Sequence, residues 1–159
     1  MDVKNLVDLF ASNVSYYKSS QYNEAQLRTD FLDPFFSMLG WDISNSAGSP
    51  TNIREVLVEE ALKTSKSQNT KKPDYTFRLF SERKFFVEAK KPSVDISTDP
   101  DPARQVRRYG FTAKLKISVL SNFEHLAIYD CSQTVSTSDA TNHSRIKLWH
   151  YSEFESCFE

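Results

Sequence analysis

Two runs of aromatic and β-branched residues, separated by a short polar turn, constrain this chain more than any other stretch. They cover residues 72–80 (KPDYTFRLF) and 84–92 (KFFVEAKKP), with Ser81-Glu82-Arg83 between them. Runs of this composition favour extended strands, and two of them around a short turn predict an antiparallel β-hairpin.

Three charged residues lie in this hairpin at positions where a purely structural hairpin would not carry them. Side chains alternate between the two faces of a strand, so Glu88 and Lys90 share one face and the apolar residues between them take the other. Asp74 opens the first strand and, in an antiparallel pair, lies opposite the end of the second. We therefore expect Asp74, Glu88 and Lys90 to meet at one end of a sheet.

Such a group suits phosphodiester hydrolysis. Carboxylates are the ligands that Mg²⁺ takes in proteins, and a bound metal lowers the pKa of the attacking water and balances phosphate charge. The expected ligands of Mg²⁺, or of Mn²⁺ in its place, are Asp74, Glu88 and the Ala89 carbonyl, with Lys90 orienting the water. The alternative is a turn residue and a solvated edge strand. The apolar run at residues 85–87 disfavours it, because that run predicts a strand buried on both faces, where unpaired charges are costly.

Pro73-Asp74 followed by Glu88-Ala89-Lys90 resembles the PD-(D/E)xK nuclease signature. The sequence KPDY…VEAKKP is similar to the corresponding motif in the nuclease domains at the N-terminus of type I restriction enzyme R subunits and of fused type IIG restriction–modification enzymes. The resemblance covers roughly residues 22–131 and implies a restriction-endonuclease-like α-β-β-β-α-β core. It also implies a DNA endonuclease that defends against foreign DNA, fused to or complexed with methyltransferase, translocase and specificity modules.

The N-terminal part predicts two helices. Residues 1–20 form an amphipathic packing helix by their apolar spacing. A second helix begins at the cap Asn23 with Gln26 as its capping-box partner, is kinked by Pro34 and ends at Gly40. Its predicted core stripe is Leu27, Phe31, Phe35 and Leu39.

Several acids compete for a place beside the metal. Glu24 and Arg28 are four residues apart, which on physics alone favours a surface ion pair. The resemblance instead implies that Glu24 is an accessory acid near the metal. Glu59 or Glu60, at the end of a first strand predicted over residues 53–62, is a further candidate. A polar, Lys-rich stretch over residues 64–72 is expected to be a mobile loop that contacts DNA backbone.

A helix after the hairpin is expected to begin with Asp99 or Asp101 as its cap and to run to about Leu115. Gln105 and Tyr109 share one of its faces. The resemblance matches a Gln-x-x-x-Tyr motif and implies that they position Lys90 or the scissile phosphate, whereas the bland alternative is a polar helix with one packed aromatic residue. The expected contacts to DNA phosphates are Lys72, Lys91, Arg104, Arg107 and Arg108.

The remaining chain predicts strands over residues 116–122 and 125–130, an exposed loop over 131–144, an edge strand over 146–150 and a helix start near the C-terminus. The fold class is α/β, with a mixed central β-sheet flanked by α-helices. We expect one nuclease domain over residues 1–159, with a packing helix at 1–20, the core at 22–131 and a connecting segment at 132–159, as a fragment of a larger protein.

Composition excludes several classes and favours none. The net charge is -1, so nothing global indicates nucleic acid, and basic residues concentrate only between Lys63 and Lys91. The two cysteines lack metal-site spacing and predict free thiols in a reducing cytosol, and no apolar run is long enough for a membrane span. We therefore expect a cytoplasmic protein that acts on double-stranded DNA. Two alternatives are a Holliday-junction or repair nuclease and a non-catalytic DNA-binding domain on the same fold.

Overall fold

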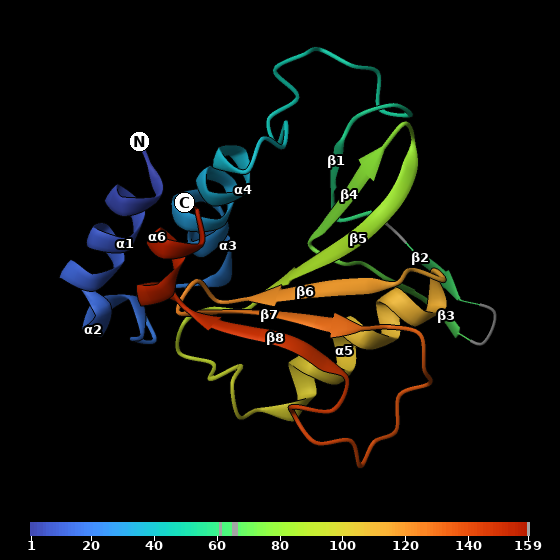
Figure 1. The fold of residues 1–159 in the computed structure, drawn as a ribbon. Coiled ribbons are helices and arrows are strands. Elements are labelled where there is room, and N and C mark those ends of the chain that lie inside the picture. The colour runs from blue at the N-terminus through green and yellow to red at the C-terminus, as the bar shows by residue number, and fades with distance from the viewer. Residues whose placement is uncertain (61, 65–66, 159) are drawn as a thin grey trace.

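A mixed six-stranded sheet between two helical layers forms the centre of the computed structural model, which describes residues 1–60, 62–64 and 67–158 (Figure 1). The helices are α1 Val3–Ser12, α2 Val14–Tyr17, α3 Glu24–Leu27, the π-helical segment η1 Arg28–Leu32, α4 Asp33–Met38, α5 Pro100–Thr112, the 3₁₀ segment η2 Tyr151–Glu153 and α6 Phe154–Cys157. The strands are β1 Val56–Val58, β2 Leu62–Thr64, β3 Ser67–Lys71, β4 Tyr75–Leu79, β5 Glu82–Ala89, β6 Ile117–Ser121, β7 His125–Asp130 and β8 Arg145–His150.

The main sheet has the strand order β1-β4-β5-β6-β7-β8, and β2 pairs only with β3. Strands β5 and β6 are parallel and are joined through α5, whereas the other neighbours in the sheet are antiparallel. A parallel pair needs a long crossover, which the helix supplies. The predicted α/β fold with a mixed sheet is confirmed.

Each face of the sheet is covered by helices. On one face α5 packs through Val106 and Tyr109, and the sheet presents Phe86 and Leu120 to it. On the other face the N-terminal helices and α6 close a larger aromatic core that includes Phe77 of β4. Figure 1 shows α5 below the sheet and the other helices gathered at its left.

The β4–β5 hairpin is the predicted one, with a different turn. Tyr75 pairs with Val87, which places Asp74 opposite Glu88. The turn consists of Phe80 and Ser81, both with positive φ, rather than of residues 81–83. Two positive φ values are what a two-residue hairpin loop needs, because they match the twist of the flanking strands.

Strand β5 is buried on both faces over residues 86–89, as its apolar run predicts. Phe86 packs against Tyr109 of α5, whereas Val87 and Ala89 belong to the core on the opposite face. The alternation therefore places the side chain of Glu88 on the α5 side of the sheet.

The first two helices form as predicted, with local corrections. Asp2 caps α1, and the helical stretch is broken at Asn13 before α2. Asn23 and Gln26 form the expected capping box at the start of α3. The expected core position of Leu39 is wrong: it follows the last residue of α4 and is 49% exposed.

Pro34 interrupts the second helix as predicted, by widening one turn. Residues 28–32 are π-helical, and the N–H of Asp33 donates to the carbonyl of Arg28, five residues back. Because proline has no N–H for an ordinary helical bond, the wider turn lets the chain pass it and continue as α4.

Two predicted segments between residues 53 and 72 differ from the structure. The strand expected over 53–62 is shorter, since only β1 joins the main sheet and Leu62 begins β2. The chain leaves the sheet at Glu59, where φ is 54°, which agrees with the predicted exit at Glu59-Glu60; residue 61 lies outside the described residues. The expected loop over 64–72 is wrong for residues 67–71, which form β3 and pair with β2; residues 65–66 lie outside the described part. Strand pairing is made by backbone N–H and C=O groups, which every one of these residues has. A polar composition therefore does not prevent the stretch from forming a strand.

The C-terminal third follows the prediction. Strands β6 and β7 form at the expected places, β8 is the edge strand, and the chain between β7 and β8 has no helix or strand. Cys131 is buried and Cys157 exposed, and both are free thiols. Over the residues that the structure describes, none of the helices combines the length and apolar character that crossing a membrane requires.

Candidate metal centre

Three carboxylates from three separate segments meet beside the start of the β4–β5 hairpin. Glu24 is the first residue of α3, Asp74 immediately precedes β4, and Glu88 is the penultimate residue of β5. One oxygen of each lies within 4.8 Å of the others. The sequence prediction paired Asp74 with Glu88 and left Glu24, Glu59 and Glu60 open as the third acid.

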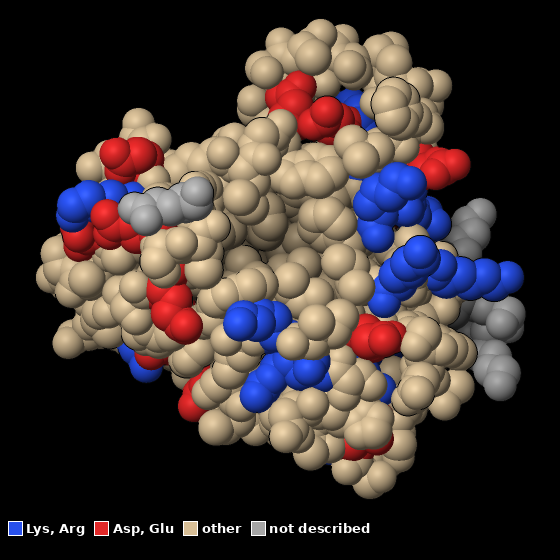
Figure 2. All heavy atoms as spheres, in the orientation of Figure 1, with Lys and Arg blue, Asp and Glu red and all other residues tan. Residues whose placement is uncertain are grey.

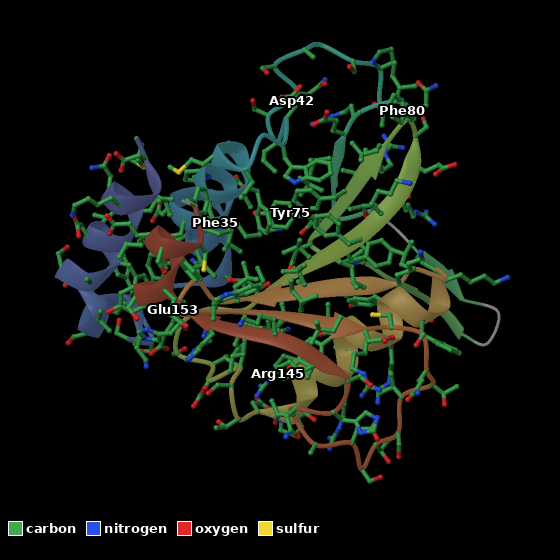
Figure 3. All side chains as sticks on the ribbon, in the orientation of Figure 1. Phe35, Asp42, Tyr75, Phe80, Arg145 and Glu153 are labelled. Atoms are coloured by element: carbon green, nitrogen blue, oxygen red, sulfur yellow. The ribbon has the colours of Figure 1, made fainter. Side chains whose placement is uncertain are left out.

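The Asp74 carboxylate is held at both oxygens. Its Oδ2 accepts a hydrogen bond of 2.7 Å from the N–H of Ala89, and its Oδ1 lies 3.4 Å from Nη1 of Arg28. The sequence predicts Ala89 as a metal ligand through its carbonyl. The contact that the structure records for Ala89 is this N–H, which orients the Asp74 carboxylate. The neighbour Tyr75 points inward from β4 (Figure 3), and its hydroxyl donates to Asp33 Oδ1 of α4, which ties the start of the strand to the helical layer.

Glu88 is the most buried acid of the group, at 4% exposure. Its Oε2 is shielded from solvent and has no hydrogen-bond partner among the described residues. Burial, and then the charge of Asp74, raise the pKa of Glu88, against an opposite effect of Lys90. A buried carboxylate oxygen without a donor is costly unless a cation compensates it.

Glu24 and Lys90 face the same cluster. The pKa of the Glu24 carboxyl is raised overall, first by its burial and then by the charge of Asp74. The charge of Lys90 acts in the opposite direction with a smaller effect. Lys90 follows β5 directly, two residues after Glu88, and its backbone N–H donates to the carbonyl of Ser121 of β6. The structure therefore brings Asp74 and Glu88 together, as expected, and places Lys90 close enough for its charge to act on Glu88 and Glu24.

A cleft of about 790 Å³ opens beside Lys90 along α5. Gln105 and Tyr109 line it, and the Gln105 amide donates to the Tyr109 hydroxyl at 2.9 Å. Burial, and then the charge of Glu88, raise the pKa of Tyr109, so its ring lies near the acid cluster. The one-face prediction for Gln105 and Tyr109 is confirmed in geometry.

The predicted basic contacts divide into two groups. Arg104 and Arg108 line the cleft, although Arg104 is also bonded to the Asp139 carbonyl at 2.9 Å. Arg107 is wrong as a phosphate contact: it is 1% exposed and pairs with Asp139 at 2.8 Å. On a helix, residue 107 points away from its neighbour Arg108, and here its side of α5 is turned into the core, where Arg104, one turn earlier, also contacts Asp139.

Lys72 and Lys91 are exposed on either side of the hairpin end that carries the acids. On the face that Figure 2 shows, Lys and Arg side chains form separate groups, one at the right beside β5 and one at the lower centre over β8. The positive charge is thus local, on a chain whose net charge is -1.

Arg28 contacts two acids that its helical spacing did not indicate. Of the two alternatives for Glu24, the surface ion pair with Arg28 is not what the structure shows, because the guanidinium instead lies 3.4 Å from Asp74 and 3.6 Å from Glu59. Glu60 turns away and accepts two hydrogen bonds from Arg83. The helical spacing of Glu24 and Arg28 signalled that both share a face, but nothing in it indicated which sheet residues that face would meet.

No known protein-family profile matches the chain. Over 157 residues it is 67% identical to the type II restriction enzyme and methyltransferase RM.Eco57I of Escherichia coli, which covers 99% of this chain and 16% of that protein. The chain therefore spans about a sixth of the length of the curated relative that it matches. A solved structure of a DrdV–DNA complex matches 94% of this chain and 82% of its own chain, with 12% identity and a TM-score of 0.45.

Proposed function

We propose that this chain is the metal-dependent nuclease domain of a restriction–modification enzyme and hydrolyses DNA phosphodiester bonds at a PD-(D/E)xK site. One observation carries the proposal: Glu24, Asp74 and Glu88 present oxygens within 4.8 Å of one another, next to Lys90. Three acids so close together, two of them buried, repel one another when ionised, and a cation between them would relieve that repulsion and replace the proton that Glu88 otherwise keeps.

The residues fit a hard divalent cation. Carboxylate oxygens are the preferred ligands of Mg²⁺ and Mn²⁺, and Glu88 Oε2 has no donor among the described residues, which leaves it available to an ion. Asp74 and Glu88 would hold the ion, with Glu24 as the accessory acid and the Ala89 carbonyl as the further ligand. When bound, the ion supplies a water of lowered pKa and balances charge on the phosphate.

The remaining side chains have roles that follow from their chemistry. Lys90 orients the attacking water by donating a hydrogen bond to its oxygen from the ammonium group. Gln105 and Tyr109 position Lys90 or the scissile phosphate, since an amide and a hydroxyl both donate and accept hydrogen bonds. Lys72, Lys91, Arg104 and Arg108 contact DNA phosphates, for which arginine offers a planar fork.

The similarity to RM.Eco57I supports the biological setting. That protein's name joins a restriction enzyme with a methyltransferase, and this chain corresponds to 16% of its length. We infer that the domain belongs to a longer cytoplasmic polypeptide with a methyltransferase and a specificity module, acting on double-stranded foreign DNA. A translocase belongs to the type I arrangement, and a fused methyltransferase to the type IIG arrangement.

Nicking of supercoiled plasmid in Mg²⁺ tests the proposal. The wild-type chain is compared with Asp74→Ala and Lys90→Ala. The matched control is Arg83→Ala, because Arg83 lies on the same hairpin as Asp74 but pairs with Glu60, away from the acid cluster. We expect nicking by the wild type and by R83A, and loss of nicking in D74A and K90A, all four being folded by circular dichroism.

Cleavage retained by purified D74A or K90A would refute the assignment. Calorimetric Mn²⁺ binding separates a nuclease from a non-catalytic DNA-binding domain. Binding that Glu88→Gln abolishes supports the metal site, whereas DNA binding without any Mn²⁺ binding would favour the non-catalytic alternative.

A further inference from the structure

Arg28 is a cation placed among the acids of the candidate metal centre. It follows Glu24 by one helical turn, at the point where α3 passes into the π-helical segment η1. Its Nη1 lies 3.4 Å from Asp74 Oδ1 and its Nη2 lies 3.6 Å from Glu59 Oε1. The guanidinium therefore stands between two carboxylates, one inside the acid cluster and one outside it.

Glu59 connects Arg28 back to the same aspartate. Its backbone N–H donates to the Asp74 carbonyl at 2.9 Å, where the chain leaves β1 with a positive φ. The contacts close a ring that runs from the Asp74 carboxylate through Arg28 and the Glu59 carboxylate to the Glu59 N–H and the Asp74 carbonyl. The ring joins the helix that carries Glu24 to the hairpin that carries Asp74.

The contact between Arg28 and Asp74 differs from an ordinary surface ion pair, whereas Glu59 holds the guanidinium from the solvent side, with its own side chain 57% exposed. The side chain of Arg28 is 20% exposed and that of Asp74 is 11% exposed, and their contact spans 46 positions in the sequence. Since the Ala89 N–H holds one oxygen of Asp74 and Arg28 holds the other, the carboxylate plane is restrained from both sides. Partners of this kind orient the groups that bind a metal.

We propose that Arg28, anchored by Glu59, is a positioning residue that holds the Asp74 carboxylate in its metal-binding orientation. The inference rests on the proposed function, because it assumes a divalent cation at Glu24, Asp74 and Glu88.

The sign of the effect on metal affinity distinguishes positioning from simple electrostatics. Arg28 is a positive charge next to the acids, so repulsion alone predicts that its removal tightens cation binding. Positioning predicts the opposite, because an unrestrained Asp74 must be ordered when the ion binds. Losing an orienting partner typically weakens metal affinity by about 10–100-fold.

The experiment measures Mn²⁺ affinity by titration calorimetry on the chain, together with plasmid nicking and thermal unfolding. The variants are Arg28→Ala, Arg28→Lys, Glu59→Gln, the double variant R28A/E59Q and the control R83A. We expect R28A to bind Mn²⁺ about 10–100-fold more weakly, with an unfolding temperature close to that of the wild type. R28K keeps the charge without the fork and recovers part of the affinity, and R83A binds as the wild type does.

Glu59 is expected to act through Arg28. E59Q should therefore weaken Mn²⁺ binding by a smaller factor than R28A, and the double variant should bind no more weakly than R28A alone. Unchanged or tighter Mn²⁺ binding by R28A would overturn the inference, as would loss of affinity that accompanies loss of the folded state. A wild-type chain that binds Mn²⁺ without nicking DNA would refute the nuclease proposal and leave this inference to be decided by the binding data.

Discussion

Replacing Glu88 by glutamine is expected to stabilise the metal-free protein at neutral and alkaline pH. Burial and the neighbouring Asp74 raise the pKa of Glu88 from 4.5 to about 10. The unfolded chain releases this proton near its ordinary pKa, whereas the folded chain keeps it. The free energy of unfolding therefore falls as the pH rises above 4.5 and stops falling only near the folded pKa. Glutamine does not titrate, so the variant avoids this loss.

The size of the effect follows from the linkage between pKa and stability. Each unit of difference between folded and unfolded pKa corresponds to about 1.36 kcal/mol. At about pH 7.5, roughly three units above the ordinary pKa, the full gain in the free energy of unfolding is about 4 kcal/mol. We expect about 2–4 kcal/mol, because the Asp74 carboxylate readjusts its position next to the uncharged amide and part of the gain is lost. For a domain of this size that gain raises the unfolding temperature by roughly 4–16 °C.

Urea unfolding of the wild type and E88Q from about pH 4 to about pH 9 measures the difference. It should be near zero at the acid end and grow with pH. Glu82→Gln is the matched control, because Glu82 lies on the same strand but is exposed and pairs with Lys84. Added Mn²⁺ should stabilise the wild type by mass action and E88Q much less. A gap that does not widen with pH would refute the reasoning.

Two further predictions concern the packing of α5. Gly110→Ala should cost about 1–3 kcal/mol, because the added Cβ meets the Cys131 Sγ and lies 2.6 Å from Ser118 Oγ on β6; an unchanged urea midpoint would show that α5 shifts freely. Asp139→Ala should lower the urea midpoint, because it leaves the buried Arg107 guanidinium without its ion pair. A midpoint equal to that of the wild type would show that water replaces the aspartate.

Local patterns predicted much of this fold. The two-residue period placed Glu88 and Lys90 on one face of β5, and the structure confirms the burial of that strand on both faces. The capping box at Asn23 marked the start of α3, and of the two predicted caps for α5, Asp99 and Asp101, the structure uses Asp99. These signals are reliable because each depends on residues within about four positions of one another, whose geometry the backbone alone sets.

The same local reasoning failed where the outcome depended on distant partners. Arg107 has the charge and helical setting of a phosphate contact, yet Asp139, 32 positions away, pairs with it in the interior. Residues 67–71 have a loop-like composition, yet they pair with β2. Neither partner could be identified from the spacing of the residues themselves.

The amino-acid sequence by itself determined that Asp74 and Glu88 meet and that Lys90 follows them, because the outer ends of two antiparallel strands lie together even though the turn differs from the predicted one. Only the tertiary structure decided that Glu24 lies beside these acids. It also decided that Arg28 pairs with Asp74 and Glu59, and that Glu60 pairs with Arg83. These contacts depend on how the N-terminal helices pack on the sheet and on the π-helical turn before Pro34. That packing is set by the whole core rather than by any one segment.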